Sequence, residues 1–227
     1  MAIEQIEAVL FDMDGTLIDS EGQTERAVER LLVERNLPVA DVDFGAFHGI
    51  TWPETADQLE VLFPVLASEP VADLLPQIFH ELFTTEFPPL IGGSREAVVT
   101  AAERFPTAIV TSGARISVEH LLDHLELRPS CRTYVCAEDC ERSKPDPQGY
   151  LLAAERLEVE PSRCLVFEDS VVGMRAARSA GMHLVAITEV ASEEAIPVGR
   201  QLAELVVRSF RELPPGFFST IAASACT

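Results

Sequence analysis

Two acidic residues, Asp12 and Asp14, stand directly after the apolar run 8–11 and just before Gly15. A short apolar run bounded by turn residues is typical of a buried strand, so both carboxylates are expected where a strand ends. Carboxylates this close cannot both stay ionised unless a cation lies between them or one keeps a proton. Such a pair can supply a nucleophile, a general acid and metal ligands. An acidic helix N-cap is the simpler alternative.

Lysine is almost absent from the chain. Lys144 is the single lysine among 17 basic residues, and the other 16 are arginine. A compact ammonium fits a tight site beside phosphate or carboxylate oxygens better than a planar guanidinium does, which suggests a reason for the exception. It lies in the stretch 143–147, a stiff proline-containing loop ahead of an amphipathic segment. The alternative is one surface lysine without a functional role.

A hydroxyl-rich turn follows another apolar run. Thr111, Ser112 and Gly113 come directly after residues 108–110. Hydroxyls and free backbone N–H groups at a strand-to-helix turn can hold an anion. Ordinary helix capping is the alternative, because Ser and Thr favour that position in any case.

A second acid pair, Glu168 and Asp169, ends the apolar run 164–167 and opens a helical stretch. These side chains offer the hard oxygen ligands that Mg²⁺ prefers, although capping again explains them when they are taken alone. The acid pair, the hydroxyl turn, the lone lysine and the second acid pair all stand at strand ends or helix starts. Their joint occurrence predicts one functional site.

Strands and helices alternate along most of the chain, which favours βαβ units and an α/β fold with a Rossmann-like parallel sheet. The predicted strands are 8–11, 107–111, 134–137, 164–167, 183–187 and 204–207. The predicted helices between them are 94–104, 117–125, 147–157 and 170–180, the last closed by Gly181.

Residues from about 21 to 87 break this alternation. Helical spacing of apolar residues over 21–35 and 71–83 predicts two helices, and Pro76 is expected to kink or split the second. We therefore predict an all-helical domain inserted into the α/β core. The predicted bounds are 1–17 and 88–227 for the core, and 18–87 for the insert.

Composition narrows the possible partners. A net charge of −20 with no basic cluster along the sequence argues against nucleic acid, and it forces any phosphate site to create its own positive field. The five cysteines include no CxxC pair, which favours reduced thiols in the cytoplasm over disulfides or a zinc site. Neither a signal peptide nor an apolar run long enough to span a membrane is predicted.

The four motifs together resemble those of the haloacid dehalogenase-like hydrolases, over essentially the whole chain. The matching segments are Asp12–Thr16, Thr111-Ser112, Lys144 and Glu168-Asp169. The phrases Phe-Asp-Met-Asp-Gly-Thr-Leu-Ile-Asp-Ser and Lys-Pro-Asp-Pro are most similar to the phosphatase and β-phosphoglucomutase-like branch. The resemblance implies that the strand before Asp12 lies near the middle of the sheet and that the insert is a helical cap domain.

Residue roles also follow from the resemblance. Asp12 would attack phosphorus and become an aspartyl phosphate. Asp14 would protonate the leaving alkoxide and then deprotonate the hydrolytic water, which requires that it hold a proton at neutral pH. Mg²⁺ would be bound by Asp12, Asp169, the backbone carbonyl of Asp14 and Glu168.

The hydroxyl-rich turn and the lysine would hold the phosphoryl oxygens. The residues are Thr111, Ser112, Gly113 and Lys144. Substrate specificity would come from the cap, where the aromatic loop 47–52 could face the active site. Candidate substrate residues are His48, Trp52 and Arg115. Packing of Trp52 in the cap core and a solvated surface position for His48 and Arg115 are the alternatives.

The resulting prediction is a cytoplasmic, Mg²⁺-dependent phosphatase, a monomer or weak dimer, that hydrolyses a small phosphorylated metabolite such as a sugar phosphate or phosphoglycolate. Dehalogenase and phosphonate-cleaving relatives are excluded, because they lack the acid that Asp14 supplies. A phosphohexomutase is the main alternative. It is disfavoured because mutase relatives use a cap His and a cap Lys, whereas the helix 21–35 has no His and the cap has no Lys. A non-catalytic, partner-binding relative is the third hypothesis.

Overall fold

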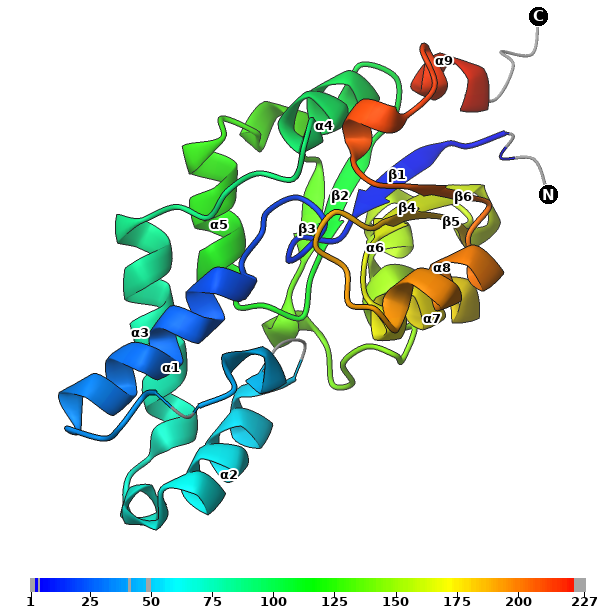
Figure 1. Cartoon of the computed structure of the whole chain (residues 1–227). Helices are drawn as coiled ribbons and strands as arrows, with labels where there is room; N and C mark the ends of the chain where they lie inside the picture. The colour runs from blue at the N-terminus through cyan, green and yellow to red at the C-terminus, as the bar shows by residue number, and fades with distance from the viewer. Residues whose placement is uncertain (1–2, 4, 41, 48–49, 223–227) are drawn as a thin grey trace, which may run out of the picture. The chain divides into compact units, whose positions relative to one another are not determined.

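Six short parallel strands form one sheet in the computed structural model, which describes residues 3, 5–40, 42–47 and 50–222 (Figure 1). The strands are β1 (Ala8–Phe11), β2 (Thr107–Val110), β3 (Thr133–Val135), β4 (Cys164–Glu168), β5 (His183–Ile187) and β6 (Leu205–Val207). Their order is β3-β2-β1-β4-β5-β6, and all five neighbouring pairs are parallel. The strand order therefore reverses direction beside β1, where ligands of such sheets bind.

Helices cover both faces of this sheet, which confirms the predicted α/β class. They are α4 (Ser94–Ala102), α5 (Arg115–His124), α6 (Gln148–Leu157), α7 (Val171–Ser179), α8 (Ala195–Leu202) and α9 (Phe217–Ile221). On one face Leu10 and Val166 pack in a core with residues of α6, α7 and α8. On the other, the rings of Phe11 and Phe167 stack with centroids 5.2 Å apart. Strand residues alternate between the two cores because successive side chains point to opposite faces.

The chain divides into two compact units. The core unit comprises Met1–Asp19 and Leu90–Thr227, and the helical unit comprises Ser20–Pro89. The helical unit contains α1 (Glu21–Glu34), α2 (Trp52–Leu62) and α3 (Val71–Thr85). At the junctions, Ile18 and Leu90 of the core unit form an antiparallel bridge, so the chain leaves and re-enters the core unit at neighbouring points.

Two features of the helical unit differ from the sequence-based expectation. The helix α2 was not predicted, although Thr51 and Glu54 form a reciprocal capping box at its start. Of the kink or split expected in α3 at Pro76, the split is wrong, because the helix continues through that residue. Pro76 removes one backbone donor near the start of the helix, and the apolar face of α3 packs into the unit's core regardless.

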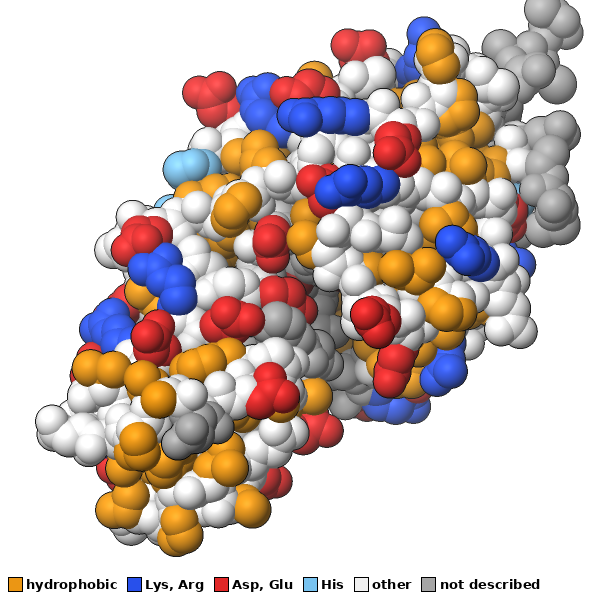
Figure 2. Space-filling view, viewed as in Figure 1, with side chains coloured by type: hydrophobic (Ala, Val, Ile, Leu, Met, Phe, Trp, Pro, Cys, Tyr) orange, Lys and Arg blue, Asp and Glu red, His pale blue; other side chains and the backbone are white. Residues whose placement is uncertain are grey.

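The surface is strongly acidic in character. Figure 2 shows Asp and Glu side chains scattered over the visible face of the molecule, in keeping with the net charge of −20. Exposed apolar side chains also occur on the helical unit, where Val61 is 82% and Val65 is 62% exposed. Within the described residues, no helix combines the length and apolar character that crossing a membrane requires.

Candidate active site

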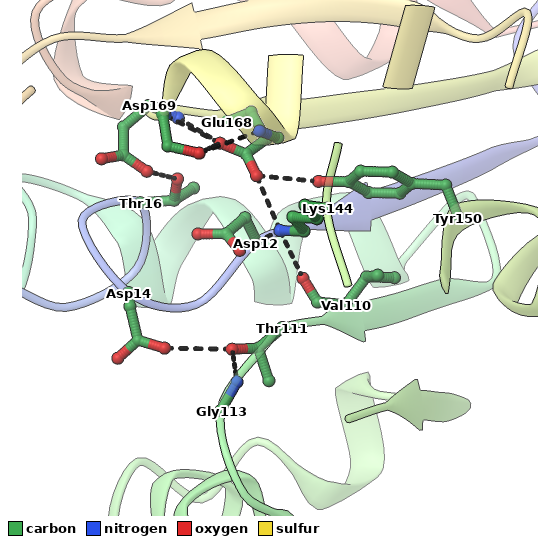
Figure 3. A network of polar contacts seen from close by, with 12 residues as sticks. Asp12, Asp14, Thr16, Val110, Thr111, Gly113, Lys144, Tyr150, Glu168 and Asp169 are labelled. Atoms are coloured by element: carbon green, nitrogen blue, oxygen red, sulfur yellow. Dashed lines mark hydrogen bonds and ion pairs between the residues drawn. The ribbon is translucent and has the colours of Figure 1, made fainter. Parts of the chain in front are cut away.

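A buried ion-pair network joins the turn after β1, the loop that carries Lys144 and the last residue of β4 at the carboxyl end of the sheet (Figure 3). The Lys144 ammonium lies 2.5 Å from Asp12 Oδ1 and 2.7 Å from Glu168 Oε1. It also donates to the backbone carbonyl of Val110, at 3.2 Å, and lies 5.1 Å from the ring centroid of Tyr150. The lone lysine is thus buried between two carboxylates, which is the tight setting that its type suggested.

Glu168 is fully buried, and both of its carboxylate oxygens are saturated with hydrogen bonds. Oε1 accepts from Lys144 and from the Tyr150 hydroxyl at 3.1 Å. Oε2 accepts from the backbone N–H groups of Asp169 and Ser170, at 2.9 and 2.8 Å, and from the Ser170 hydroxyl at 3.0 Å. Five donors fix the position of this side chain, which in turn holds the ammonium of Lys144.

The position of the Glu168 side chain requires a glycine on α7. A Cβ atom at Gly173 would lie 1.6 Å from Glu168 Oε1, far inside van der Waals contact. The Ser170 hydroxyl caps the same helix by accepting from the Gly173 N–H at 3.0 Å. Capping and buried-anion binding therefore occur together here, and the two interpretations of this acid pair are not exclusive.

Asp14 has different surroundings from Asp12, although only one residue separates them. Its Oδ2 accepts a hydrogen bond from the Thr111 hydroxyl at 3.0 Å, and that hydroxyl accepts from the Gly113 N–H at 2.9 Å. Asp14 is half-buried, and Ser112 lies exposed in the same turn. The end of β1 thus meets the hydroxyl-rich turn after β2, as the parallel pairing of these strands requires.

A hydrogen bond holds the Asp169 side chain close to the turn that follows β1. Thr16 is fully buried and donates its hydroxyl to Asp169 Oδ1 at 2.9 Å. Gly15 has a φ of +79°, and a Cβ atom there would lie 2.1 Å from Asp169 Oδ2. A residue with a side chain would be strained at this φ and would also displace the carboxylate.

The electrostatics of the cluster favour a divalent cation. Ligand oxygens of Asp12, Glu168 and Asp169 all lie within 4.8 Å of one another. Burial, followed by repulsion from Glu168, raises the pKa of Asp12 to about 8 and also raises the pKa of Asp169 well above its ordinary value. Three ionised carboxylates beside one ammonium would leave an excess of two negative charges, which a divalent ion would balance. Hard oxygen donors are also the ligands that such an ion takes.

Burial opposes the charge on Lys144. The neighbouring carboxylates Asp12 and Glu168 outweigh that penalty and hold the pKa of Lys144 well above its ordinary value. Burial and Glu168 likewise raise the pKa of Tyr150, so its hydroxyl keeps its proton and remains a donor. The ammonium is therefore a permanent positive charge at the site.

Two of the three candidate substrate residues contact side chains of their own unit. The Arg115 guanidinium is paired with Asp139 at 2.9 Å. The Trp52 ring packs edge-on against Phe79 within the helical unit, with centroids 5.5 Å apart. His48 lies outside the described residues.

The model of the haloacid dehalogenase-like hydrolase family matches residues 6–181, a range that contains every residue of the network. The chain belongs to the haloacid dehalogenase-like hydrolases. The enzyme is thus a hydrolase, and the family suggested by its four motifs is confirmed.

Curated relatives of this hydrolase include two phosphatases. It is 33% identical to validoxylamine A 7'-phosphate phosphatase of Streptomyces hygroscopicus subsp. limoneus, over 82% of this chain and 88% of that protein. It is 31% identical to a fructose-1-phosphate phosphatase of Escherichia coli, over 80% of this chain and 96% of that protein. A solved hydrolase of the family from Deinococcus radiodurans, with bound phosphate and sodium, has a TM-score of 0.73 and 26% identity over 96% of this chain and 99% of that one.

Sequence reasoning missed two side chains of the hydrolase's network, Tyr150 and Thr16. Tyr150 looks like one more apolar residue on the buried face of α6, and only the fold reveals that its hydroxyl reaches Glu168. Thr16 belongs to the first motif, but its bond to Asp169 joins segments 153 residues apart. Contacts of this range leave no periodic signal in the sequence.

Proposed function

We propose that this hydrolase is a Mg²⁺-dependent phosphatase of small phosphomonoesters that forms an aspartyl phosphate on Asp12. The observation that carries the proposal is the different environment of the two acids in one turn. Asp12 lies beside the ammonium of Lys144, and Asp14 lies beside the hydroxyl of Thr111. Two carboxyl groups with different neighbours can take different roles, one as nucleophile and the other as acid and base.

In the first half of the reaction, a carboxylate oxygen of Asp12 attacks phosphorus. The bond from phosphorus to the ester oxygen breaks, and the leaving alkoxide takes the proton of Asp14. Lys144, the Thr111 hydroxyl and the N–H groups of the turn at Ser112 and Gly113 would bind the phosphoryl oxygens as negative charge redistributes among them. The Thr111 hydroxyl would then exchange its bond to Asp14, and the Gly113 N–H its bond to Thr111, for bonds to the phosphoryl group.

In the second half, Asp14 has become a carboxylate and removes a proton from a water molecule. That water attacks phosphorus, the acyl-phosphate bond breaks, and Asp12 is restored as a carboxylate while phosphate leaves. Asp14 ends protonated, so each turnover returns both acids to their starting states. Lys144 and Glu168 keep the Asp12 carboxylate in one place through both halves.

The metal would be held by the carboxylates of Asp12 and Asp169 and by the backbone carbonyl of Asp14. When bound, Mg²⁺ would neutralise the phosphoryl group and the nucleophile so that they can approach each other. We propose only an indirect role for Glu168, which the sequence suggested as a further ligand. Its two oxygens already accept five hydrogen bonds, and a direct metal bond would require it to lose some of them.

A sugar phosphate is the substrate class that the relatives support, because those reported above are named as phosphatases of validoxylamine A 7'-phosphate and fructose 1-phosphate. Phosphoglycolate is a smaller candidate of the same ester type. We propose that the helical unit is a cap that selects among them.

The test is a screen for phosphate release from sugar phosphates, phosphoglycolate and nucleotides, with and without Mg²⁺. Asp12→Asn serves as the control that removes the nucleophile while keeping its size. We expect Mg²⁺-dependent release for at least one ester and none from the variant. Release that is equal without Mg²⁺, or in Asp12→Asn, would contradict the proposal.

A phosphohexomutase would use the same aspartyl phosphate. The absence of lysine from residues 18–87 disfavours it, since mutase relatives carry a cap lysine. A mutase would need a bisphosphate activator and would isomerise a hexose phosphate with little release of phosphate. Measuring phosphate and isomer from the same sample distinguishes the two activities.

A further inference from the structure

Four arginines line a cavity of about 320 Å³ at the outer edge of the sheet, beside the edge strand β3. They come from α5, from the segment before β3 and from α6, so they form no cluster along the sequence. The arginines are Arg115, Arg128, Arg132 and Arg156. Among the described residues no carboxylate lines this cavity, although the chain has 37 acidic residues against 17 basic ones.

Two of these arginines are held in place by a single acid. Arg115 Nη2 and Arg156 Nη2 each lie 2.9 Å from the same oxygen of Asp139, whose side chain is only 12% exposed. Arg156 Nη1 also donates to the backbone carbonyl of Tyr134, and the Arg115 guanidinium lies 5.6 Å from the Tyr134 ring centroid. One carboxylate shared by two guanidinium groups leaves a net positive charge, and both groups keep further N–H donors.

Of the other two arginines, only Arg132 adds to this charge. Arg128 is paired with Asp123, whereas Arg132 is exposed and has no ion pair within the described part of the chain. Two more acids lie near the cavity and offset part of the arginine charge, and each accepts a hydrogen bond. Glu119 accepts from a tyrosine hydroxyl, and Glu138 accepts from a backbone N–H.

We propose that this cavity is a second anion site, separate from the catalytic network, for a small phosphate compound with two or more negative charges. The planar fork of arginine matches phosphate oxygens, and several such forks around one cavity suit a pyrophosphate or a bisphosphate. The site shares no residue with the network of Asp12, Lys144 and Glu168. It therefore stands whether or not the proposed phosphatase activity is found.

The test is calorimetric titration of the full chain with inorganic pyrophosphate in Mg²⁺-free buffer. The variants are Arg132→Gln, which breaks no ion pair, and the double variant Arg128→Gln/Arg132→Gln. Arg200→Gln is the matched control, since Arg200 is an exposed arginine on α8 with the same charge. We expect saturable one-to-one binding that weakens about tenfold for each cavity arginine removed and is unchanged in the control.

Two further titrations show where the anion binds and which kind of phosphate compound binds more tightly. Lys144→Ala should leave pyrophosphate affinity unchanged, because the ammonium lies in the catalytic network. Replacing pyrophosphate by a hexose bisphosphate shows whether the tighter ligand is inorganic or organic, and either result supports the site. No saturable binding, equal weakening in Arg200→Gln, or loss of binding in Lys144→Ala would each overturn the proposal. Unfolding curves of all variants confirm that they are folded.

Discussion

The core unit contains one deeply buried ion-pair network, whereas the described ion pairs within the helical unit are partly or largely exposed. The side chains of Lys144, Asp12 and Glu168 in the core unit are 10%, 7% and 0% exposed. In the helical unit, Arg30 and Glu81 form a pair whose side chains are 42% and 60% exposed. Breaking a buried pair costs about 3–5 kcal/mol, whereas an exposed pair contributes roughly 0–1 kcal/mol.

This difference shows where charge is used for chemistry. The helical unit is stabilised by an apolar core that includes Leu31, Leu59 and Leu75, and its surface pairs add little. The core unit places a lysine and three carboxylates together at one end of the sheet, although burying charged groups lowers the stability of the fold. A costly arrangement of this kind is expected where function requires it.

The largest expected effect comes from replacing a glycine by alanine, and the two units offer one such site each. Gly173→Ala places a Cβ atom where Glu168 lies, so we expect a loss of about 3–5 kcal/mol in the free energy of unfolding and loss of activity. Gly22→Ala, on α1 with nothing within 4 Å of the new atom, should instead stabilise the protein by up to about 1 kcal/mol. Urea unfolding measures both changes, and an active, fully stable Gly173→Ala would contradict the described network.

Lys144→Arg comes next. The guanidinium keeps the charge but is too large and too planar for a site enclosed by Asp12, Glu168 and Tyr150, so we expect kcat to fall about a hundredfold. The reverse exchange two residues away, Arg142→Lys, is the control, because the Arg142 side chain is 68% exposed. Unaltered turnover by Lys144→Arg would show that the tight setting of the lysine has no catalytic importance.

Metal binding should depend on pH in a direction set by Asp12. Its pKa, raised to about 8 by burial and Glu168, means that a proton competes with the cation below that pH. Mg²⁺ affinity should therefore rise with pH up to at least pH 8, by about tenfold per pH unit for each carboxyl group that must lose a proton, since the pKa of Asp169 is raised as well. The proton stabilises the folded metal-free protein fully below the ordinary pKa of 3.8, and this contribution is lost as the pH rises through about 8. Thermal unfolding with and without Mg²⁺ across this pH range checks both statements, and a flat Mg²⁺ affinity would refute them.

The smallest effect is expected for Tyr150→Phe, which removes one of the five donors to Glu168. We expect kcat to fall by a factor of about three to ten, with KM little changed, because the hydroxyl positions Lys144 through Glu168 and does not touch substrate. Tyr134→Phe is the matched control, since its hydroxyl bonds to Glu119 outside the network. An equal loss in both variants, or a change confined to KM, would remove this role from Tyr150.

Much of the fold could be predicted because its signals are local. Short apolar runs with helical stretches between them gave β1 and β5 with their observed bounds, and the order of motifs placed Asp12 and Lys144 in one site. Pro76 misled because a local penalty was outweighed by packing along the whole of α3. The contacts of Tyr150 and Thr16 and the arginine cavity could not be found, since they depend on which distant segments the sheet brings together.

The central claim is that the Asp12 side chain carries a transient acyl phosphate. Rapid quenching of the enzyme with a phosphorus-labelled substrate and Mg²⁺, followed by peptide mapping, tests it directly. The account predicts an acid-stable, base-labile label on the peptide that contains Asp12, formed at least as fast as turnover and lacking in Asp12→Asn. Sustained ester cleavage with no label on that peptide would contradict it.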